Sequence, residues 1–296
     1  MSSNFHLNEV KSMDNPDSPS EIYRNWSNLP LDVTLMILMK LGAVEILESV
    51  QFVCKMWYIL CKEPSLWRTI RIHNLARARR EINHEKMLFN AIDRSDGRLI
   101  DLDINRFGSD ELCSYVSSRS SQLKRLRLTR CRNISADAVI QALEKLSCLE
   151  EVELSFCRFQ VAKTVAIINA CPSLTTFKFN KLGGFEGSYE ACDEEALAIA
   201  GRMPELRHLQ LIENNMTSVG LTAILDACPH LQSLELRECY ELHLTPSLRK
   251  RLSEEIKDLQ YSSSDSDEYS DIDYLGGHDD FEYSDDEIAD YYRNKY

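Results

Sequence analysis

The stretch "LKRLRL" at residues 123–128 has leucine at its first, fourth and sixth positions. The same template, L-x-x-L-x-L, recurs as "LEEVEL" from Leu149, "LTTFKF" from Leu174, "LRHLQL" from Leu206 and "LQSLEL" from Leu231. A degenerate copy, "LIDLDI", starts at Leu99, and successive starts are separated by 24, 26, 25, 32 and 25 residues. This nearly constant spacing indicates an internal repeat.

A period of 24 to 26 residues is typical of leucine-rich repeats, each of which contributes one strand and one helix. Each template alternates buried and exposed positions at the strand period of two. The residues that follow switch to helical spacing, as in Ala138, Ala142 and Leu146. Because a single unit cannot bury its own apolar side, neighbouring units must stack. We therefore predict an α/β leucine-rich-repeat solenoid over residues 99–260, with parallel strands on the concave face and helices outside.

The segment before the repeats, residues 25–68, predicts a small all-α unit of three helices. Its first helix opens at Pro30, since proline suits the first turn, where its missing N–H is not needed. The stretch "SNLPLDVTLMILMKLGA" at 27–43 is apolar on more than one helix face. A surface helix needs only one apolar stripe, so the other faces must be buried against something else.

The remaining segments connect or flank these two regions. Residues 69–98 predict a connecting strand and helix, where "LWRTIRI" from Leu66 supplies the strand. Residues 1–24 are polar without periodicity, and residues 261–296 are strongly acidic, so we expect both ends to be disordered.

Charge is distributed unevenly along the chain, whose net charge is −13. Between Tyr261 and Asp290 there are twelve Asp and Glu and no Lys or Arg. The rest is nearly neutral and lacks clustered basic residues, which argues against a nucleic-acid partner. Apolar runs are too short to cross a membrane and no secretory signal pattern is present. We expect an intracellular protein of the nucleus, the cytoplasm or both, with its ten cysteines reduced.

Motifs for catalysis and metal binding are scarce. The sequence contains no phosphate-binding glycine loop, no dinucleotide fingerprint, no H-E-x-x-H and no C-x₂-C. Cys131, Cys157 and Cys239 each lie eight residues after the first leucine of a template, where we expect structural packing. The sequence therefore predicts a non-catalytic protein without metal or cofactor, and an enzyme with a thiol nucleophile is the weakest alternative.

Polar residues between the paired leucines are expected on the concave face, the surface that solenoids present to partners. The predicted substrate-binding residues are Asp103, Arg125, Arg127, Glu151, Glu153, Lys178, His208, Gln210, Glu235 and Arg237. A structural interpretation is compatible with this one, because lateral pairing of Arg127 with Asp103 and Glu153 would hold the strands in register.

The helical segment resembles an F-box. The match starts at Leu29-Pro30 and continues through "VCKMW" at 53–57 to "LW" at 66–67. The repeats resemble the leucine-rich half of the plant F-box/LRR family, in stretches such as "RSSQLKRLRLTRC". Together the resemblance covers residues 26–260.

This resemblance implies that the F-box docks on a Skp-type adaptor, which connects to cullin and RING subunits. The extra apolar faces of the first helix would then complete a core shared with the adaptor, as in helix-in-groove recognition. The implied adaptor-binding residues are Leu29, Pro30, Leu35, Ile37, Leu38, Leu41, Val50, Val53 and Trp57.

The implied function is that of a substrate-recognition subunit of an SCF-type (Skp–cullin–F-box) E3 ubiquitin ligase, with an unknown protein as its substrate. One alternative is an LRR protein-interaction scaffold without a ligase role. Another is that the F-box-like residues pack only on the first repeats.

Two further segments carry expectations. Ser262, Ser264 and Ser284 each have an acidic residue three positions on, as acidophilic kinases favour, so we expect phosphorylation there. Residues 182–190 interrupt the repeat spacing, and we interpret them as an insertion that bends the solenoid or touches the substrate.

Overall fold

The computed structural model of the 296-residue chain describes residues 29–73, 83–171, 174–181 and 191–261. All of them belong to the first of two units, residues 1–262. The N-terminal arm, the insertion at 182–190 and the acidic tail with its three candidate phosphosites lie outside the described residues.

Short helices make up the chain before the first strand. They are α1 (Leu31–Leu38), α2 (Ala43–Glu48), the 3₁₀ turn η2 (Val50–Phe52), α3 (Lys55–Leu60) and the 3₁₀ turn η3 (Pro64–Trp67). As predicted, α1 begins directly after Pro30, whose carbonyl accepts the Thr34 N–H at 2.9 Å. Elements this short cannot form a core alone, and their buried residues Leu38, Ile46 and Leu60 join the core of the repeats.

Strands and helices alternate through the rest of the described chain, which confirms the predicted repeat architecture. The strands are β1 (Thr69–His73), β2 (Asp101–Asn105), β3 (Arg125–Thr129), β4 (Glu151–Ser155), β5 (Thr176–Asn180), β6 (His208–Ile212), β7 (Ser233–Arg237) and β8 (Asp258–Tyr261). The helices are α4 (His84–Arg94), α5 (Asp110–Arg119), α6 (Ala136–Lys145), α7 (Val161–Ala170), α8 (Glu194–Arg202), α9 (Ser218–Ala227) and α10 (Pro246–Glu255).

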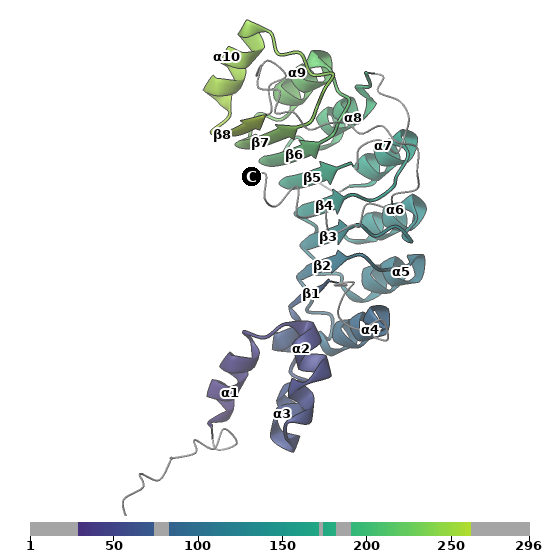
Figure 1. The fold of residues 1–296 in the computed structure, drawn as a ribbon, viewed down its shortest axis with the longest axis vertical. Helices are drawn as coiled ribbons and strands as arrows, with labels where there is room; N and C mark the ends of the chain where they lie inside the picture. The colour runs from purple at the N-terminus through teal and green to yellow at the C-terminus, as the bar shows by residue number, and fades with distance from the viewer. Residues whose placement is uncertain (1–28, 74–82, 172–173, 182–190, 262–296) are drawn as a thin grey trace, which may run out of the picture. The chain divides into compact units, whose positions relative to one another are not determined.

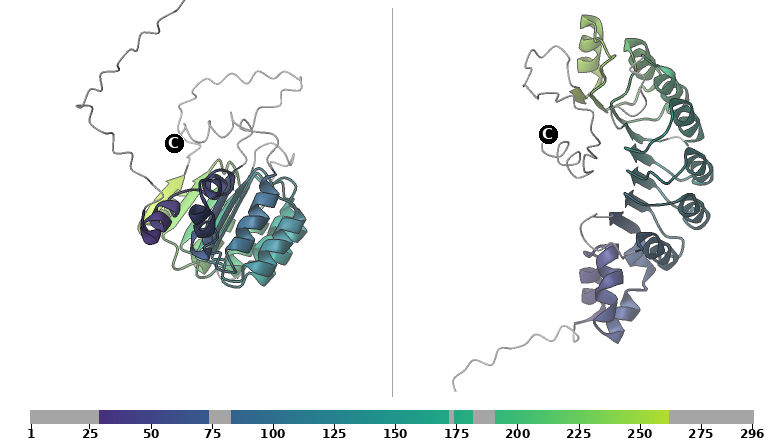
Figure 2. Two further views of the ribbon diagram at one scale, coloured as in Figure 1. Left: turned by 90° about the horizontal axis from the view of Figure 1, so that it is seen from below. Right: turned by 45° about the vertical axis from the view of Figure 1, so that its right-hand side comes forward.

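The strands form one parallel sheet in chain order, β1 to β8. Register pairs the middle leucine of each template with its counterpart, as Leu126 pairs with Leu102 and Val152, and all three are buried. The helices form a second layer on one side of the sheet (Figure 1). Within the repeats the strands line the inner, concave side and the helices the outer side (Figure 2).

The residue after several strands adopts the left-handed conformation, although it is not glycine. Arg130 has φ 54° and Phe156 has φ 59°, and Arg106, Glu213 and Glu238 behave alike. The backbone N–H of Arg130 donates to the carbonyl of Ser155 at 2.8 Å, and that of Arg106 donates to Thr129 at 2.9 Å. This additional backbone hydrogen bond extends the pairing of the strands by one residue. It offsets the free-energy cost of the left-handed backbone conformation at a bulky residue.

Trp67 joins the helical segment to the repeats. Its side chain is fully buried, and its Nε1 donates to the carbonyl of Cys61 at 3.0 Å. The guanidinium of Arg94, at the end of α4, donates from Nη1 to the same carbonyl at 3.3 Å and from Nη2 to Gln51 Oε1 at 2.8 Å. Helix α4 therefore holds the helical segment against the first repeat.

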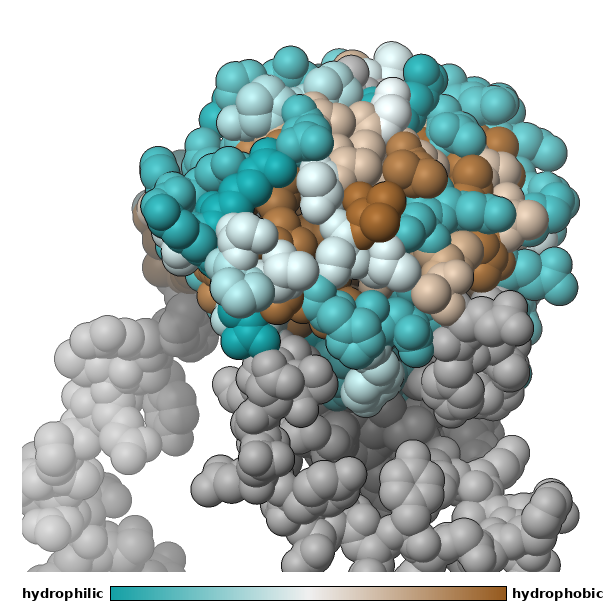
Figure 3. All heavy atoms as spheres, turned by 90° about the horizontal axis from the view of Figure 1, so that it is seen from above, coloured by the Kyte–Doolittle hydropathy of each residue, from teal (hydrophilic) through white to brown (hydrophobic). Residues whose placement is uncertain are grey.

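The opposite end of the sheet is formed by β8 and α10. Hydrophilic residues make up most of this end, and hydrophobic ones show in smaller groups between them (Figure 3). A terminal repeat has no further unit to cover it, and a largely polar outer face keeps it in water.

Candidate functional site

Exposed apolar side chains gather on the helical segment before β1. The large hydrophobic residues exposed there are Leu31, Val33, Met36, Met39, Phe52, Val53, Tyr58 and Ile59. Through the described part of the repeats and β8, the corresponding set is only Leu197, Val219, Tyr240 and Tyr261. This concentration of exposed apolar surface makes the helical segment the candidate interaction surface of the described chain.

The predicted adaptor-binding residues divide by burial. Pro30 and Val53 are exposed, the latter by 61%. Leu38 and Val50 are buried and pack inside the segment. The half-buried members are Leu29, Leu35, Ile37, Leu41 and Trp57. Leu38 and Val50 therefore support the surface from within, whereas Pro30 and Val53 belong to the surface itself.

Several exposed residues of this surface are absent from the predicted set. Phe52 is 72% exposed, and Tyr58 and Ile59 lie on α3 with exposed side chains. For α1 the sequence contains a pattern that indicates which residues are exposed. Val33, Met36 and Met39 follow at three-residue steps, which places them together on the side opposite the buried Thr34 and Leu38. For Phe52 no such signal exists, since the 3₁₀ turn interrupts the helical phase after α2.

The predicted concave residues all lie on one face of the sheet, in three rows across the strands. Register places Asp103, Arg127, Glu153, Lys178, Gln210 and Glu235 in one row. Arg125, Glu151 and His208 lie in the row before it, and Arg237 lies in the row after it. The structure thus brings together residues that are more than a hundred positions apart in the sequence.

The β2–β4 part of this face is a lattice of paired charges. Asp101, almost fully buried, receives Arg127 Nη1 at 2.9 Å on Oδ1 and Arg125 Nε at 3.1 Å on Oδ2. Arg127 Nη2 lies 2.9 Å from Glu151 Oε1. Each of these arginines already has a carboxylate partner within the protein, so the lattice serves the register of the strands.

The lateral pairing expected for Arg127 is found only with Glu153, and diagonal contacts to the preceding row are closer. Arg127 is level with Asp103 and Glu153, but its closest contacts are with Asp101 and Glu151, and Glu153 is 3.9 Å away. The long side chain leans along its strand and reaches the preceding row. Asp103 pairs instead with His73 Nε2 at 3.1 Å.

The β5–β7 part of the face is less committed to internal pairs. Lys178 lies 4.0 Å from Glu153, the limit for an ion pair. His208 is exposed and Gln210 half-buried. Arg237 pairs along its own strand with Glu235 at 2.6 Å. Binding of a partner to the polar side chains of this half therefore has a lower desolvation cost than binding to those of the charge lattice.

Comparison with known proteins assigns the family. Residues 26–73 match the F-box-like family model, and residues 175–270 match the model described as FBD-associated F-box protein At5g56370, LRR repeats. F-box protein SKIP19 of Arabidopsis thaliana is 44% identical over 87% of this chain and 88% of its own. The chain belongs to the plant F-box/LRR-repeat family.

Other F-box/LRR-repeat relatives agree with this assignment. F-box/LRR-repeat protein 22 of Arabidopsis thaliana is 40% identical over 83% of this chain and 80% of its own. F-box/LRR-repeat protein 23 is 46% identical over 83% of this chain, which spans only 55% of that relative. Among solved structures, the yeast Rad7–Elc1 complex contains a chain with TM-score 0.48 and 15% identity, covering 75% of this chain and 52% of that one.

Six of the ten cysteines of this F-box/LRR-repeat protein are buried in its core. Sγ of Cys131 donates to the carbonyl of Ile104 at 3.7 Å, and Sγ of Cys157 donates to that of Leu128 at 3.5 Å, so each thiol caps the preceding repeat. Burial raises the pKa of Cys171 to about 12. A thiol with such a pKa is protonated at neutral pH and is not a nucleophile.

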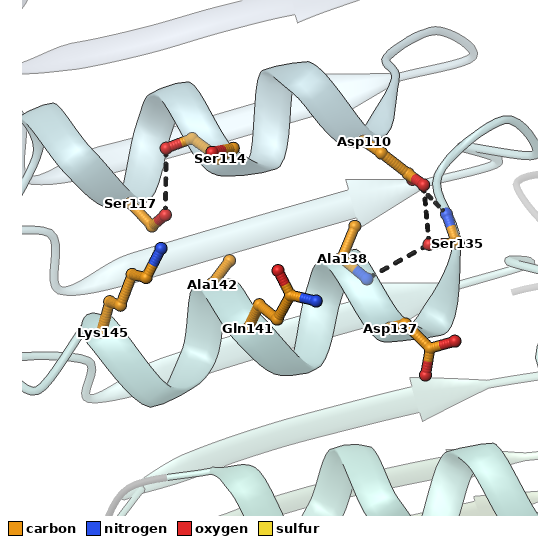
Figure 4. Close-up of a pocket in the computed structure, with 9 residues that line it drawn as sticks. All are labelled: Asp110, Ser114, Ser117, Ser135, Asp137, Ala138, Gln141, Ala142 and Lys145. Atoms are coloured by element: carbon orange, nitrogen blue, oxygen red, sulfur yellow. Dashed lines mark hydrogen bonds between the residues drawn. The ribbon is translucent and has the colours of Figure 1, made fainter.

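A polar groove lies on the helical side of this F-box/LRR-repeat protein, between α5 and α6 (Figure 4). At one end Asp110 accepts hydrogen bonds from the backbone N–H and the Oγ of Ser135, at 2.6 and 2.8 Å. Ser135 Oγ in turn accepts the Ala138 N–H and so caps α6. These groups therefore join the first turns of α5 and α6.

Two features are absent from the residues that the structure describes. No group of three or more His, Cys, Asp or Glu side chains is placed to hold a metal ion there. None of the helices between Leu31 and Glu255 that the structure describes has the length and apolar character to span a bilayer.

Proposed function

We propose that this protein is the substrate-recognition subunit of an SCF-type E3 ubiquitin ligase and that it has no catalytic role of its own. The exposed apolar side chains of the F-box bind a Skp-type adaptor, which connects to cullin and RING subunits. A protein substrate lies on the concave face. Holding the substrate near the ubiquitin-loaded enzyme accelerates transfer by proximity.

One observation carries this proposal. Eight large hydrophobic side chains are exposed between Leu31 and Ile59, a density that the described repeats do not approach. Fully covering one such side chain contributes about 1.5–3 kcal/mol, so burying several against a partner supports a stable complex. The position of this surface at the N-terminal end leaves the concave face of the repeats available for another protein.

On the concave face, we place the substrate over β5–β7. Lys178, His208 and Gln210 present polar groups there, whereas Arg125 and Arg127 are held by Asp101 and Glu151. Binding over the charge lattice would require those pairs to break or to be extended, at a desolvation cost. An assembly of this kind acts inside the cell, in the nucleus, the cytoplasm or both.

Reconstitution of the full chain with a Skp-type adaptor, a cullin and a RING subunit tests the proposal. Size-exclusion chromatography of the mixture is expected to show one stoichiometric assembly. Leu31→Ser is expected to lower the amount of this assembly, because Leu31 is exposed. The chain is expected to stay folded, because the buried Thr34 that anchors α1 is unchanged. A folded wild-type chain that elutes alone would favour an LRR interaction scaffold without a ligase role.

A further inference from the structure

The outward face of α1 carries two exposed methionines. Thr34 and Leu38 are fully buried on the inner side of the helix. Val33, Met36 and Met39 follow at three-residue steps, which places them on the opposite side. Met36 is 66% exposed and Met39, the residue that ends α1, is 51% exposed. Two thioethers therefore lie one turn apart in solvent.

The other methionines of the described ranges are better protected. Met203 and Met216 are fully buried in the repeat core, and Met56 and Met87 are half-buried against it. Oxidation of methionine requires access of the oxidant to sulfur, and it converts a flexible apolar side chain into a polar one. Among the methionines of the described ranges, dilute peroxide would therefore reach Met36 and Met39 first.

We propose that Met36 and Met39 form a reversible oxidation site that controls adaptor docking, an inference that rests on the function proposed above. The thioether sulfur attacks one oxygen of hydrogen peroxide, an S–O bond forms and the O–O bond breaks. Sulfur loses two electrons, the proton on the sulfur-bound oxygen passes to the leaving hydroxide, and the second peroxide oxygen leaves as water. The product sulfoxide is polar, so covering it with an apolar partner surface without a hydrogen bond is unfavourable.

Peroxide also oxidises cysteine, and the effect of cysteine oxidation has to be separated from that of methionine oxidation. Cys54 is half-buried in the same segment, where its Sγ accepts the Trp57 N–H at 3.5 Å. Dithiothreitol reduces disulfides and sulfenic acids but leaves methionine sulfoxide intact. Methionine sulfoxide reductases A and B together reverse both sulfoxide epimers.

The test uses the full chain. It is treated with hydrogen peroxide, then with dithiothreitol, and desalted, and its Kd for a Skp-type adaptor is measured beside that of untreated chain. Peptide mass spectrometry establishes one added oxygen on Met36 and on Met39, and circular dichroism establishes that the chain remains folded. The matched variant is Met36→Leu with Met39→Leu, which keeps the volume and apolar character but removes the sulfur.

Oxidation is expected to raise the Kd of the wild-type chain about tenfold or more. The two reductases are expected to restore the original Kd, and the double leucine variant to change by less than about twofold under the same treatment. Unchanged affinity after full oxidation of both methionines, or equal loss in the leucine variant, would overturn this regulation alone. Absence of binding by the untreated chain would overturn the proposed function and the regulation with it.

Discussion

The guanidinium of Arg94 lies over the ring of Trp67, with its Cζ 5.3 Å from the ring centroid. Trp67 ends the 3₁₀ turn η3 and Arg94 is the last residue of α4, so this contact joins the helical segment to the helix that connects it with the repeats. Burial lowers the pKa of Arg94, which remains cationic, and its Nη1 also bonds the Cys61 carbonyl.

Loss of this contact is expected to destabilise the chain. Arg94→Ala removes the stacked cation and two hydrogen bonds, so the free energy of unfolding should fall by about 1–2 kcal/mol. Urea denaturation of the full chain measures this. Arg119→Ala is the matched control, because Arg119 lies over Tyr115 and pairs with Asp93 at the surface. A drop in the control equal to that of Arg94→Ala would contradict a special role for this contact.

Asp101 is expected to be the most sensitive residue of the charge lattice. It is nearly buried and faces Arg71, Arg125 and Arg127, so Asp101→Asn leaves their charges without this partner. We expect a loss of about 2 kcal/mol in unfolding free energy, whereas exposed Asp137→Asn should change it by about 0.5 kcal/mol or less. Comparable melting temperatures for the two variants would show that the lattice does not stabilise the sheet.

The pair of His73 and Asp103 predicts a pH dependence. The hydrogen bond to the Asp103 carboxylate raises the pKa of His73 above its usual 6.5. Because the pKa of His73 is raised in the folded state, its protonated form stabilises the fold. This contribution to the free energy of unfolding is complete below pH 6.5 and disappears as the pH rises through the folded-state pKa. The difference in unfolding free energy between wild type and His73→Gln should therefore be larger at pH 6 than at pH 9. A difference that stays constant between these pH values would contradict the pair.

Thiol reactivity separates a structural from a catalytic role of the cysteines. Burial raises the pKa of Cys113 and of Cys171 to about 12, whereas Cys148 is exposed. Iodoacetamide at pH 8 should label Cys148 in the native chain and should label Cys113 and Cys171 only after unfolding. Rapid native labelling of either buried thiol, located by peptide mass spectrometry, would reopen the enzyme alternative.

Sequence periodicity predicted the repeats well because each template repeats the same physical requirement. Leu102, Leu126 and Val152 face the core in successive strands, and the alternation of apolar and polar residues is sufficient to place them. The weak first strand was predicted from "LWRTIRI", and β1 confirms it. Packing of this kind is local and recurs in every repeat, so it can be predicted from a single sequence.

The candidate site was less predictable, because it depends on contacts between elements. Apolar content alone does not distinguish buried Leu38 from exposed Met36, two residues before it. The exposure of Phe52 follows from a 3₁₀ turn that no periodicity announces. The diagonal ion pair of Arg127 depends on the position of Asp101 in the neighbouring strand. It also depends on Asp103 being paired with His73.

The affinity of the full chain for a Skp-type adaptor, measured by isothermal titration calorimetry, tests the central claim most directly. The probe variant is Phe52→Ser, at a side chain 72% exposed, and the control is Leu197→Ser, at a side chain 51% exposed on α8. We predict that the wild type binds one adaptor, that Phe52→Ser weakens binding about tenfold or more, and that Leu197→Ser stays within about twofold. A folded wild-type chain that does not bind, or equal affinities of the two variants, would contradict adaptor docking through the F-box surface.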